Sequence, residues 1–389
     1  MSKRHLSLIL HGFWAIPLVI LMRLLKPFLI IRAGQVFSGR IGHFVTDSFE
    51  HVIRRNFLPV TTFDFLSFGD ISNGQWAEMI KRNIRVFGSW TKFVGEWNRI
   101  IPGGKLHGLP SSFTDSRDLE GLFVRYSMNL PFTESETANA EEYLSKKGWQ
   151  RGEPYICLLV RDDSFIKSLQ KSPNDASERY SRDSDIDTYV PAIQWLIEQG
   201  VWVLRMGKVM AHPIDLSSKY FIDYAFDPER SDLLDVWLFA NCTATISTGS
   251  GPDVISLVYQ RPILFLNVAY LTDFWSYANC TWVPKWLFWK NESDLLSVTE
   301  QIEVGGYTDS QFNAAGVRLI DLDENEILCE VKLFWDRING RNKETDEEMI
   351  LQDHFWQIAM KAPKFRQYNS WRHPHSRMGK NWLTRVKLE

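Results

Sequence analysis

The sequence predicts an α/β protein in which strands alternate with helices around a doubly wound parallel sheet. Short apolar runs at Tyr155–Val160, Val201–Met206 and Ile263–Asn267 read as buried strands. Apolar residues at helical spacing occupy Thr188–Gln199, between the first two runs. The length of 389 residues exceeds that of a usual single domain, so we expect two domains. Strands that alternate with helices are typical of a parallel sheet covered by helices.

The composition is that of a globular protein. Hydrophobic residues make up 44% and charged residues 23% of the chain, enough to build real cores. The net charge of −3 gives no reason to expect nucleic acid as a partner. The cysteines are widely spaced and form no C-x-x-C pair, which argues against a zinc site and a disulfide-rich secreted fold. They are Cys157, Cys242, Cys280 and Cys329. We therefore expect a cytoplasmic location.

The N-terminus carries an apolar stretch, Leu6–Met22, flanked by Lys3 and Arg4 on one side and Arg23 and Lys26 on the other. It is shorter than the ~20 apolar residues of a spanning helix, and no small-residue cleavage site follows it. The pattern favours a helix in the inner-membrane interface, so the protein would be peripheral to that membrane. The alternative is a buried N-terminal helix of the fold.

Turn signals divide the chain into four segments. The apolar helix takes residues 1–27, and an N-terminal α/β domain takes residues 28–150, up to a Gly-Glu-Pro turn. A second α/β domain follows at 151–340. The last segment, 341–389, combines an amphipathic helix with a basic tail. We expect that tail to pack back on the N-terminal domain; the alternatives are a solvated tail and one that touches anionic lipid.

A Ser/Gly-rich loop follows the strand at Thr243–Ser247 and opens a helix. Its glycines permit a tight turn and close approach to a ligand. The helix start presents free N–H groups, a favourable place for a diphosphate, and the loop hydroxyls add donors. An ordinary helix-capping connection is the alternative. The loop residues are Ser247, Thr248, Gly249, Ser250 and Gly251.

The sequence lacks the motifs of two other classes of nucleotide-binding protein. No G-x-G-x-x-G follows a strand, and no G-x-x-x-x-G-K-[ST] occurs, so a nicotinamide dehydrogenase and a P-loop nucleotidase are disfavoured. Asp253, close after the loop, is an unusual neighbour for a phosphate. We expect it to face a sugar or ribose hydroxyl, or to complement the helix dipole.

Three arginines are expected at the same rim of the second sheet. Arg161 and Arg205 follow or end strands, and Arg182 precedes the helix at 188–199. Arginines in such positions can hold phosphate oxygens in a bidentate fork. The alternative for Arg161 is an ion pair with Asp162 or Asp163. Three cations at one rim favour an anionic ligand.

The first glycine-containing loop of the N-terminal domain carries His43. A histidine there can remove a proton from an acceptor hydroxyl near neutral pH. Asp47, one helical turn later, could orient the ring or act as the base itself. A helix-capping or otherwise satisfied histidine is the alternative.

Several of these segments together resemble a family of bacterial glycosyltransferases from envelope-polysaccharide gene clusters. The matching segments are 38–43 (SGRIGH), 180–186 (YSRDSDI), 203–208 (VLRMGK), 247–251 (STGSG) and 376–380 (SRMGK). The resemblance implies the GT-B fold, with two Rossmann-like domains facing a cleft. It also implies that the donor nucleotide binds in the C-terminal domain and the acceptor in the N-terminal one, with no obligatory metal.

The expected activity is transfer of a sugar, hexosyl or deoxyhexosyl, from a nucleotide-diphosphate sugar to a hydroxyl of a lipid-linked or surface glycan. No metal and no cofactor is expected, although the D-x-D at Asp183–Asp185 leaves a metal-dependent alternative open. Two rival functions remain. One is a sugar-nucleotide epimerase or hydrolase of the same fold. The other is a non-catalytic nucleotide-binding scaffold of an envelope assembly complex.

Overall fold

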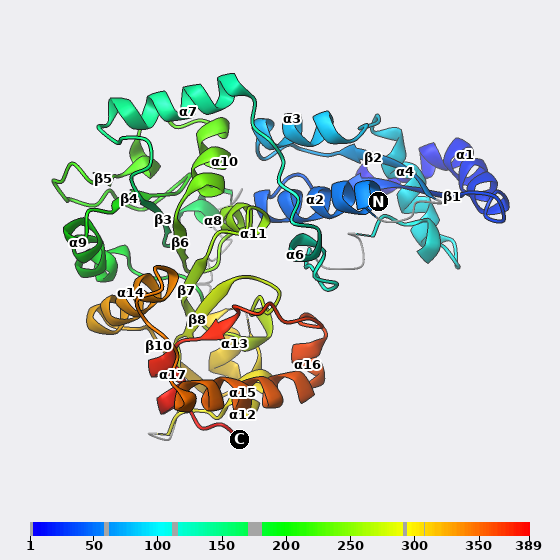
Figure 1. Cartoon of the computed structure of the whole chain (residues 1–389). Coiled ribbons are helices and arrows are strands. Elements are labelled where there is room, and N and C mark those ends of the chain that lie inside the picture. Colours follow the sequence, from blue (N-terminus) through cyan, green and yellow to red (C-terminus); the bar gives the residue numbers. More distant parts are fainter. Residues whose placement is uncertain (1–2, 58–61, 111–115, 170–180, 291–293, 307) are drawn as a thin grey trace. The chain divides into compact units, whose positions relative to one another are not determined.

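The computed structural model describes residues 3–57, 62–110, 116–169, 181–290, 294–306 and 308–389 (Figure 1). The chain forms two compact units. The N-terminal unit comprises residues 1–118 and 122–132, and the C-terminal unit comprises 119–121 and 133–389. The division therefore precedes helix α7 (Glu134–Lys146), which packs with α10 (Asp232–Asn241) of the C-terminal unit, whereas the sequence placed the boundary at 150.

The N-terminal unit has a small parallel sheet and several helices. Strands β1 and β2 pair in parallel, with Ile30 opposite Thr62, and form a two-stranded sheet. This sheet is smaller than that of a full Rossmann-like domain. The elements are α1 (Lys3–Leu24), β1 (Ile30–Val36), α2 (Ile41–Phe57), β2 (Thr62–Phe68), α3 (Gly74–Asn83), α4 (Trp90–Ile100), η1 (Lys105–His107) and α6 (Leu122–Tyr126).

Helix α1 is part of the N-terminal unit. One face, which includes Ala15 and Val19, packs into a core with Val94 of α4. Gly12 faces the ring of Trp97 so closely that a Cβ would lie 2.8 Å from it, so only glycine fits there. The guanidinium of Arg23 donates hydrogen bonds to the backbone and side chain at the end of α4. These contacts fix α1 along the unit.

The C-terminal unit is built on a seven-stranded parallel sheet in the order β11-β8-β7-β6-β3-β4-β5. Helix α9 (Val190–Glu198) packs with α14 (Glu324–Ile338), and α10 packs with α7 (Figure 1). The expected alternation of strands and helices is confirmed. Its strands are β3 (Tyr155–Leu159), β4 (Trp202–Arg205), β5 (Phe221–Ile222), β6 (Ala244–Ser247), β7 (Ile263–Val268), β8 (Cys280–Pro284) and β11 (Arg377–Met378). Strands β9 (Trp286–Trp289), which follows β8 in the chain, and β10 (Val317–Ile320) form a separate antiparallel pair.

Helices connect these strands. They are α8 (Ser164–Leu169), α9 (Val190–Glu198), α10 (Asp232–Asn241), α11 (Val254–Val258), α12 (Val298–Val304), α13 (Asp309–Ala314), α14 (Glu324–Ile338), α15 (Asp346–Lys361), α16 (Pro363–Arg366) and α17 (Lys380–Arg385). Short 3-10 turns are η2 (Ile186–Tyr189), η3 (Tyr224–Phe226), η4 (Gly251–Asp253) and η5 (Leu271–Asp273). Helix α9 starts with proline at its second position, a residue well suited to a first turn.

The strand order creates a switch point between β3 and β6. From β3 the chain proceeds outward to β4 and β5, then returns to β6 and continues to β7 and β8 on the other side. The connections after β3 and β6 therefore leave the sheet in opposite directions. In open parallel sheets, ligands bind in the crevice that forms at such a point, outside the carboxyl ends of the strands.

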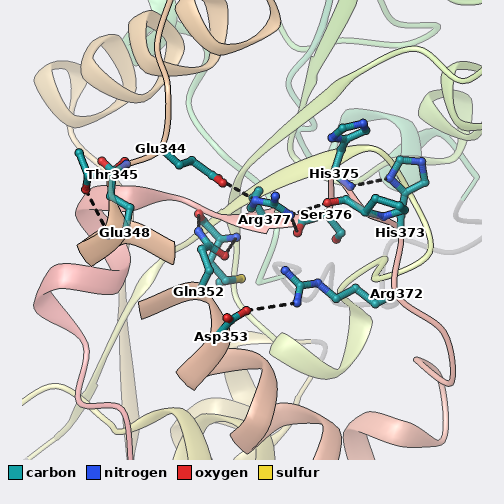
Figure 2. Close-up of polar contacts among 12 residues, drawn as sticks. Glu344, Thr345, Glu348, Gln352, Asp353, Arg372, His373, His375, Ser376 and Arg377 are labelled. Carbon is teal, nitrogen blue, oxygen red and sulfur yellow. Dashed lines mark hydrogen bonds and ion pairs between the residues drawn. The ribbon is translucent and has the colours of Figure 1, made fainter. Parts of the chain in front are cut away.

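The C-terminal tail belongs to the C-terminal unit. The side chain of Gln352 on α15 accepts from the backbone N–H of Met378 at 3.1 Å and donates to its carbonyl at 2.7 Å (Figure 2). Arg377 pairs with Glu344 at 2.7 Å and begins β11, which adds to the sheet beside β8. The tail is thus an edge strand of this sheet, whereas the sequence led us to expect packing on the N-terminal domain.

Candidate functional site

The loop after β6 is joined to the end of β3. The backbone N–H of Arg161 donates to the hydroxyl of Thr248 at 2.9 Å. The backbone N–H of Thr248 in turn donates to the carbonyl of Leu159 at 3.2 Å. Both connections lie at the switch point of the sheet, so the structure brings Arg161 together with the Ser/Gly-rich loop, as the sequence predicted.

An ion pair attaches a third segment to this rim. The guanidinium Nε of Arg161 lies 2.9 Å from Oδ1 of Asp183, and their side chains are only 11% and 6% exposed. The N–H of Ser184 donates to the carbonyl of Arg161 at 2.9 Å. The sequence considered Asp162 or Asp163 as the partner of Arg161, and the structure places Asp183 there.

Two residues that the sequence analysis did not identify form hydrogen bonds to the segment of Asp183 and Ser184. Lys285, after β8, donates to the carbonyl of Asp183 at 2.9 Å and pairs with Asp321 at 2.6 Å. Asn267, in β7, donates to the hydroxyl of Ser184 at 3.0 Å from a backbone with φ of 58°. Asparagine is one of the few residues that tolerate positive φ. A polar residue at the end of an apolar run was the available signal for Asn267.

Inside the loop, Asp253 organises the backbone. Its Oδ2 accepts from the hydroxyl of Ser247 and from the N–H of Ser250, both at 2.7 Å. The N–H of Gly249, a residue with φ of 80°, donates to the hydroxyl of Ser247 at 3.1 Å. Asp253 is fully buried, so it shapes the loop, whereas the sequence led us to expect a sugar, a ribose or the helix dipole as its partner. Burial raises the pKa of Asp253 to about 7, against the hydrogen bonds that lower it.

The loop consequently offers fewer donors than its sequence suggests. The hydroxyls of Ser247 and Thr248 are fully buried and bonded within the protein. The N–H groups of Gly249 and Ser250 also have internal acceptors. Within the part of the chain that the structure describes, the N–H of Gly251 makes no hydrogen bond. A ligand would therefore meet Gly251 and the hydroxyl side of Ser250.

Arg182 is the cation of this rim with unused hydrogen-bonding capacity. Its Nε is buried and has no hydrogen-bond partner among the described residues. Burial lowers the pKa of Arg182, but Tyr270, Asp273 and Asp253 more than offset this and raise the pKa above its ordinary value. Tyr270 and Asp273 follow β7, so a third connection of the sheet contributes to the electrostatics of this rim.

Arg205 is fully buried at the end of β4. Its side chain is 1% exposed, and Nη1 pairs with Asp223 at 3.2 Å and donates to the carbonyl of His212 at 2.6 Å. The guanidinium also lies over the ring of Phe226. These contacts are those of an interior ion pair. The Nε and Nη2 of Arg205 are buried and have no hydrogen-bond partner among the described residues, so the role of Arg205 at the ligand stays a prediction.

His43 and Asp47 lie on α2 of the N-terminal unit. The Nδ1 of His43 is 2.5 Å from the hydroxyl of Ser116, and its ring packs edge-on against Phe37. His43 is half-buried, whereas Asp47 is buried. The hydrogen bond to Ser116 holds the ring of His43 in one orientation.

The D-x-D does not form one metal site. Asp183 pairs with Arg161, whereas Asp185 is exposed and accepts from the N–H of Asp187 at 3.0 Å. A different group could hold a metal: Asp185, Asp187 and His212 have ligand atoms within 4.8 Å of one another, all exposed. Exposed acidic groups of this kind are common without an ion.

No family model and no curated protein matches the sequence significantly. Among solved structures, the ADP-heptose LPS heptosyltransferase II of E. coli is 12% identical, with a TM-score of 0.41, and the match covers 79% of this chain and 99% of that one. A family 9 glycosyl transferase from Veillonella parvula is 12% identical, with a TM-score of 0.39, covering 66% and 86%. At this identity and these TM-scores, neither match tells us what this chain binds.

Proposed function

We propose that this protein is a glycosyltransferase that uses a nucleotide-diphosphate sugar. One observation carries the proposal: Arg161, Arg182 and the loop of residues 247–251 converge on the switch point between β3 and β6. This is where open parallel sheets bind nucleotides. An anionic ligand is favoured because Arg182 keeps a buried N–H without a partner.

In this proposal the arginines act on the leaving diphosphate. Arg182 and Arg161 would contact its oxygens, and the N–H of Gly251 would add a third donor. Charge grows on the diphosphate as the bond to the sugar breaks, and preorganised donors stabilise that charge without a metal. Asp183 would act as a positioning residue because it holds Arg161, and Asp253 because it shapes the loop.

The acceptor side of the reaction is assigned to the N-terminal unit. His43 would remove the proton from the acceptor hydroxyl, with Asp47 as the alternative base. We propose a lipid-linked or surface glycan as the acceptor and a hexosyl or deoxyhexosyl group as the transferred sugar. The protein would need no cofactor beyond its donor substrate.

We further propose that the protein is cytoplasmic and peripheral to the inner membrane. Helix α1 is long and apolar enough to cross a membrane by length and composition. However, its Ala15 face and Arg23 are fixed to α4, so the helix would lie along the membrane surface. Its opposite face is apolar and exposed. That face comprises Leu6, Ile9, Leu10, Phe13, Ile20, Leu21 and Leu24.

The test of glycosyl transfer starts with nucleotide binding. We would measure thermal shifts with UDP, GDP, ADP, CMP and TDP, without metal, for the wild type and for Arg161→Ala and Arg182→Ala. Arg151→Ala is the matched control because its side chain is 81% exposed. We expect one nucleotide to raise the Tm of the wild type and the control and to have a much smaller effect on the two variants.

Turnover assays with the matching sugar nucleotide then separate the rival functions. Sugar transfer that depends on an added acceptor supports the proposal. Turnover of the donor without acceptor identifies an epimerase or hydrolase instead. Binding without any turnover identifies a scaffold, and the absence of any nucleotide effect rejects the site.

A further inference from the structure

A pocket with several polar and charged lining residues lies at the other end of the sheet in the C-terminal unit. It has a volume of about 70 Å³ and is formed by α14, α15, α17 and the strands β8 and β11. Thr281, near the start of β8, is among its lining residues. Arg161, by contrast, follows the carboxyl end of the parallel strand β3. The pocket therefore lies apart from the proposed donor site. It includes Arg377 and Lys380 of the SRMGK segment, which the donor site does not use.

Three polar groups of this pocket lack protein partners. Glu330 is 3% exposed and Thr281 is 7% exposed, yet neither Oε1 of Glu330 nor Oγ1 of Thr281 has a hydrogen-bond partner. Within the described residues, the guanidinium of Arg337 makes no hydrogen bond or ion pair and only lies over the ring of Phe334 at 5.7 Å. A buried polar group without a partner costs about 1–3 kcal/mol, so such groups usually have a ligand or water.

The other charged groups of the pocket are satisfied. Arg377 pairs with Glu344 (Figure 2), and Lys380 pairs with Glu348. The first pair links β11 to Glu344, just before α15, and the second links α17 to α15. The unused capacity is therefore concentrated on one carboxylate, one hydroxyl and one guanidinium. A matching ligand needs one hydrogen-bond donor for the carboxylate and acceptor oxygens for the other two.

We propose that this pocket binds inorganic phosphate in its singly protonated form, hydrogen phosphate. Its P–O–H would donate to Oε1 of Glu330, and its unprotonated oxygens would accept from Arg337 and Thr281. The volume of about 70 Å³ exceeds the share of one water and suits a group of this size. Sulfate has similar size but no proton to donate at neutral pH, so it would place an oxygen anion against the carboxylate.

The preference for phosphate over sulfate should depend on pH. Burial raises the pKa of Glu330 to about 7, although hydrogen bonds from Asn381 lower it. Above that pKa the carboxylate can only accept, so it admits phosphate and rejects sulfate. Below it, the protonated side chain can donate to either anion. The other charged groups around Glu330 are Glu326, Arg337, Glu344, Glu348, Arg377 and Lys380.

The first experiment is isothermal titration of the full chain at pH 8 with inorganic phosphate and with sulfate. We expect phosphate to bind at least tenfold more tightly than sulfate. We expect Arg337→Met to lose phosphate binding and Glu330→Gln to bind sulfate better than the wild type does, because the amide can donate. Glycerol phosphate at the same pH tests the role of the proton. A phosphomonoester has a second pKa of about 6 and carries no proton at pH 8, so we expect it to bind as weakly as sulfate, and binding as tight as that of inorganic phosphate would overturn the proposal.

The variant Arg161→Ala separates this pocket from the donor site. We expect it to bind phosphate as the wild type does, even where it loses nucleotide binding. No phosphate binding by the wild type, or equal affinity for phosphate and sulfate at pH 8, would overturn the proposal. So would phosphate binding that persists in Arg337→Met and disappears in Arg161→Ala. The comparison of anions on the wild type needs no variant, so a misfolded variant leaves that test intact.

Discussion

The Nε of Arg161 and the Oδ1 of Asp183 lie 2.9 Å apart, with both side chains almost buried. This pair joins the connection after β3 to the segment that carries Arg182. A buried ion pair contributes little net stability by itself, but removal of one partner leaves an uncompensated charge. A change at Asp183 should therefore affect both the stability of the protein and the positions of Arg161 and Arg182.

Replacement of Asp183 should affect both stability and ligand binding. We expect Asp183→Ala to lower the free energy of unfolding by about 3 kcal/mol, because the nearly buried guanidinium of Arg161 loses the carboxylate that lies 2.9 Å from its Nε. The matched control is Asp163→Ala, since Asp163 pairs with Lys167 on the surface and should change stability by less than about 1 kcal/mol. Urea unfolding and nucleotide thermal shifts measure the two effects. If Asp183→Ala binds the nucleotide as tightly as the wild type does, Arg161 does not need Asp183 to hold it in place for binding.

Asp253 should make the protein less stable as the pH rises. Its pKa is raised to about 7 by burial, so between its unfolded value and pH 7 the folded state binds the proton more tightly than the unfolded state. Stability is then full at low pH and falls by at most about 1.4 kcal/mol per pH unit until the folded pKa is passed. Asp253→Asn removes this titration.

The measurement is the free energy of unfolding in urea from pH 5 to pH 8. Glu330 also has a raised pKa of about 7 and shifts stability in the same direction. The informative quantity is therefore the difference between the wild type and Asp253→Asn at each pH. We expect that difference to change from pH 5 to about pH 7 and then to level off. Parallel curves for the two proteins would mean that Asp253 does not titrate there.

The sheet of the C-terminal unit could be predicted because each central strand is a continuous apolar run. Tyr155–Val160 and Val201–Met206 were located to within a residue as β3 and β4. Strand β2 was not predicted, because Thr62–Phe68 alternates aromatic and polar residues without a clear turn before it. Strand β11 has only two residues, and its place beside β8 depends on Gln352, far away in sequence.

The candidate site could be predicted only in part. The loop at 247–251 could be recognised in the sequence by its glycines. Which of its groups can bind a ligand depends on Asp253, whose carboxylate accepts from the Ser247 hydroxyl and the Ser250 N–H. Arg161 and Arg205 look equivalent in sequence because both lie at strand ends. Only the packing shows that Arg205 has Asp223 beside it, because the turn that brings them together has no local signal.

The exposed face of α1 should control binding to membranes. We expect the wild type to cosediment with anionic phosphatidylglycerol vesicles, and Leu10→Asp with Phe13→Asp to bind about a hundredfold more weakly, since the lost burial of two apolar side chains is worth roughly 3 kcal/mol. These side chains are 61% and 80% exposed, so the fold should tolerate the change. Met349→Asp with Ile350→Asp is the control, as both residues are exposed on α15. Equal loss in the two double variants would exclude α1 as the specific contact.

His43 should matter for chemistry and not for donor binding. We expect His43→Ala to reduce sugar transfer by about a hundredfold or more, the usual effect of losing a general base, with the nucleotide thermal shift unchanged. Ser116→Ala is the matched variant, because the Ser116 hydroxyl lies 2.5 Å from Nδ1 of His43 and only orients the ring. It should cost less than His43→Ala and leave the pH profile of the reaction similar in shape. If transfer survives in His43→Ala and is lost in Asp47→Asn, the aspartate is the base and the histidine a structural neighbour.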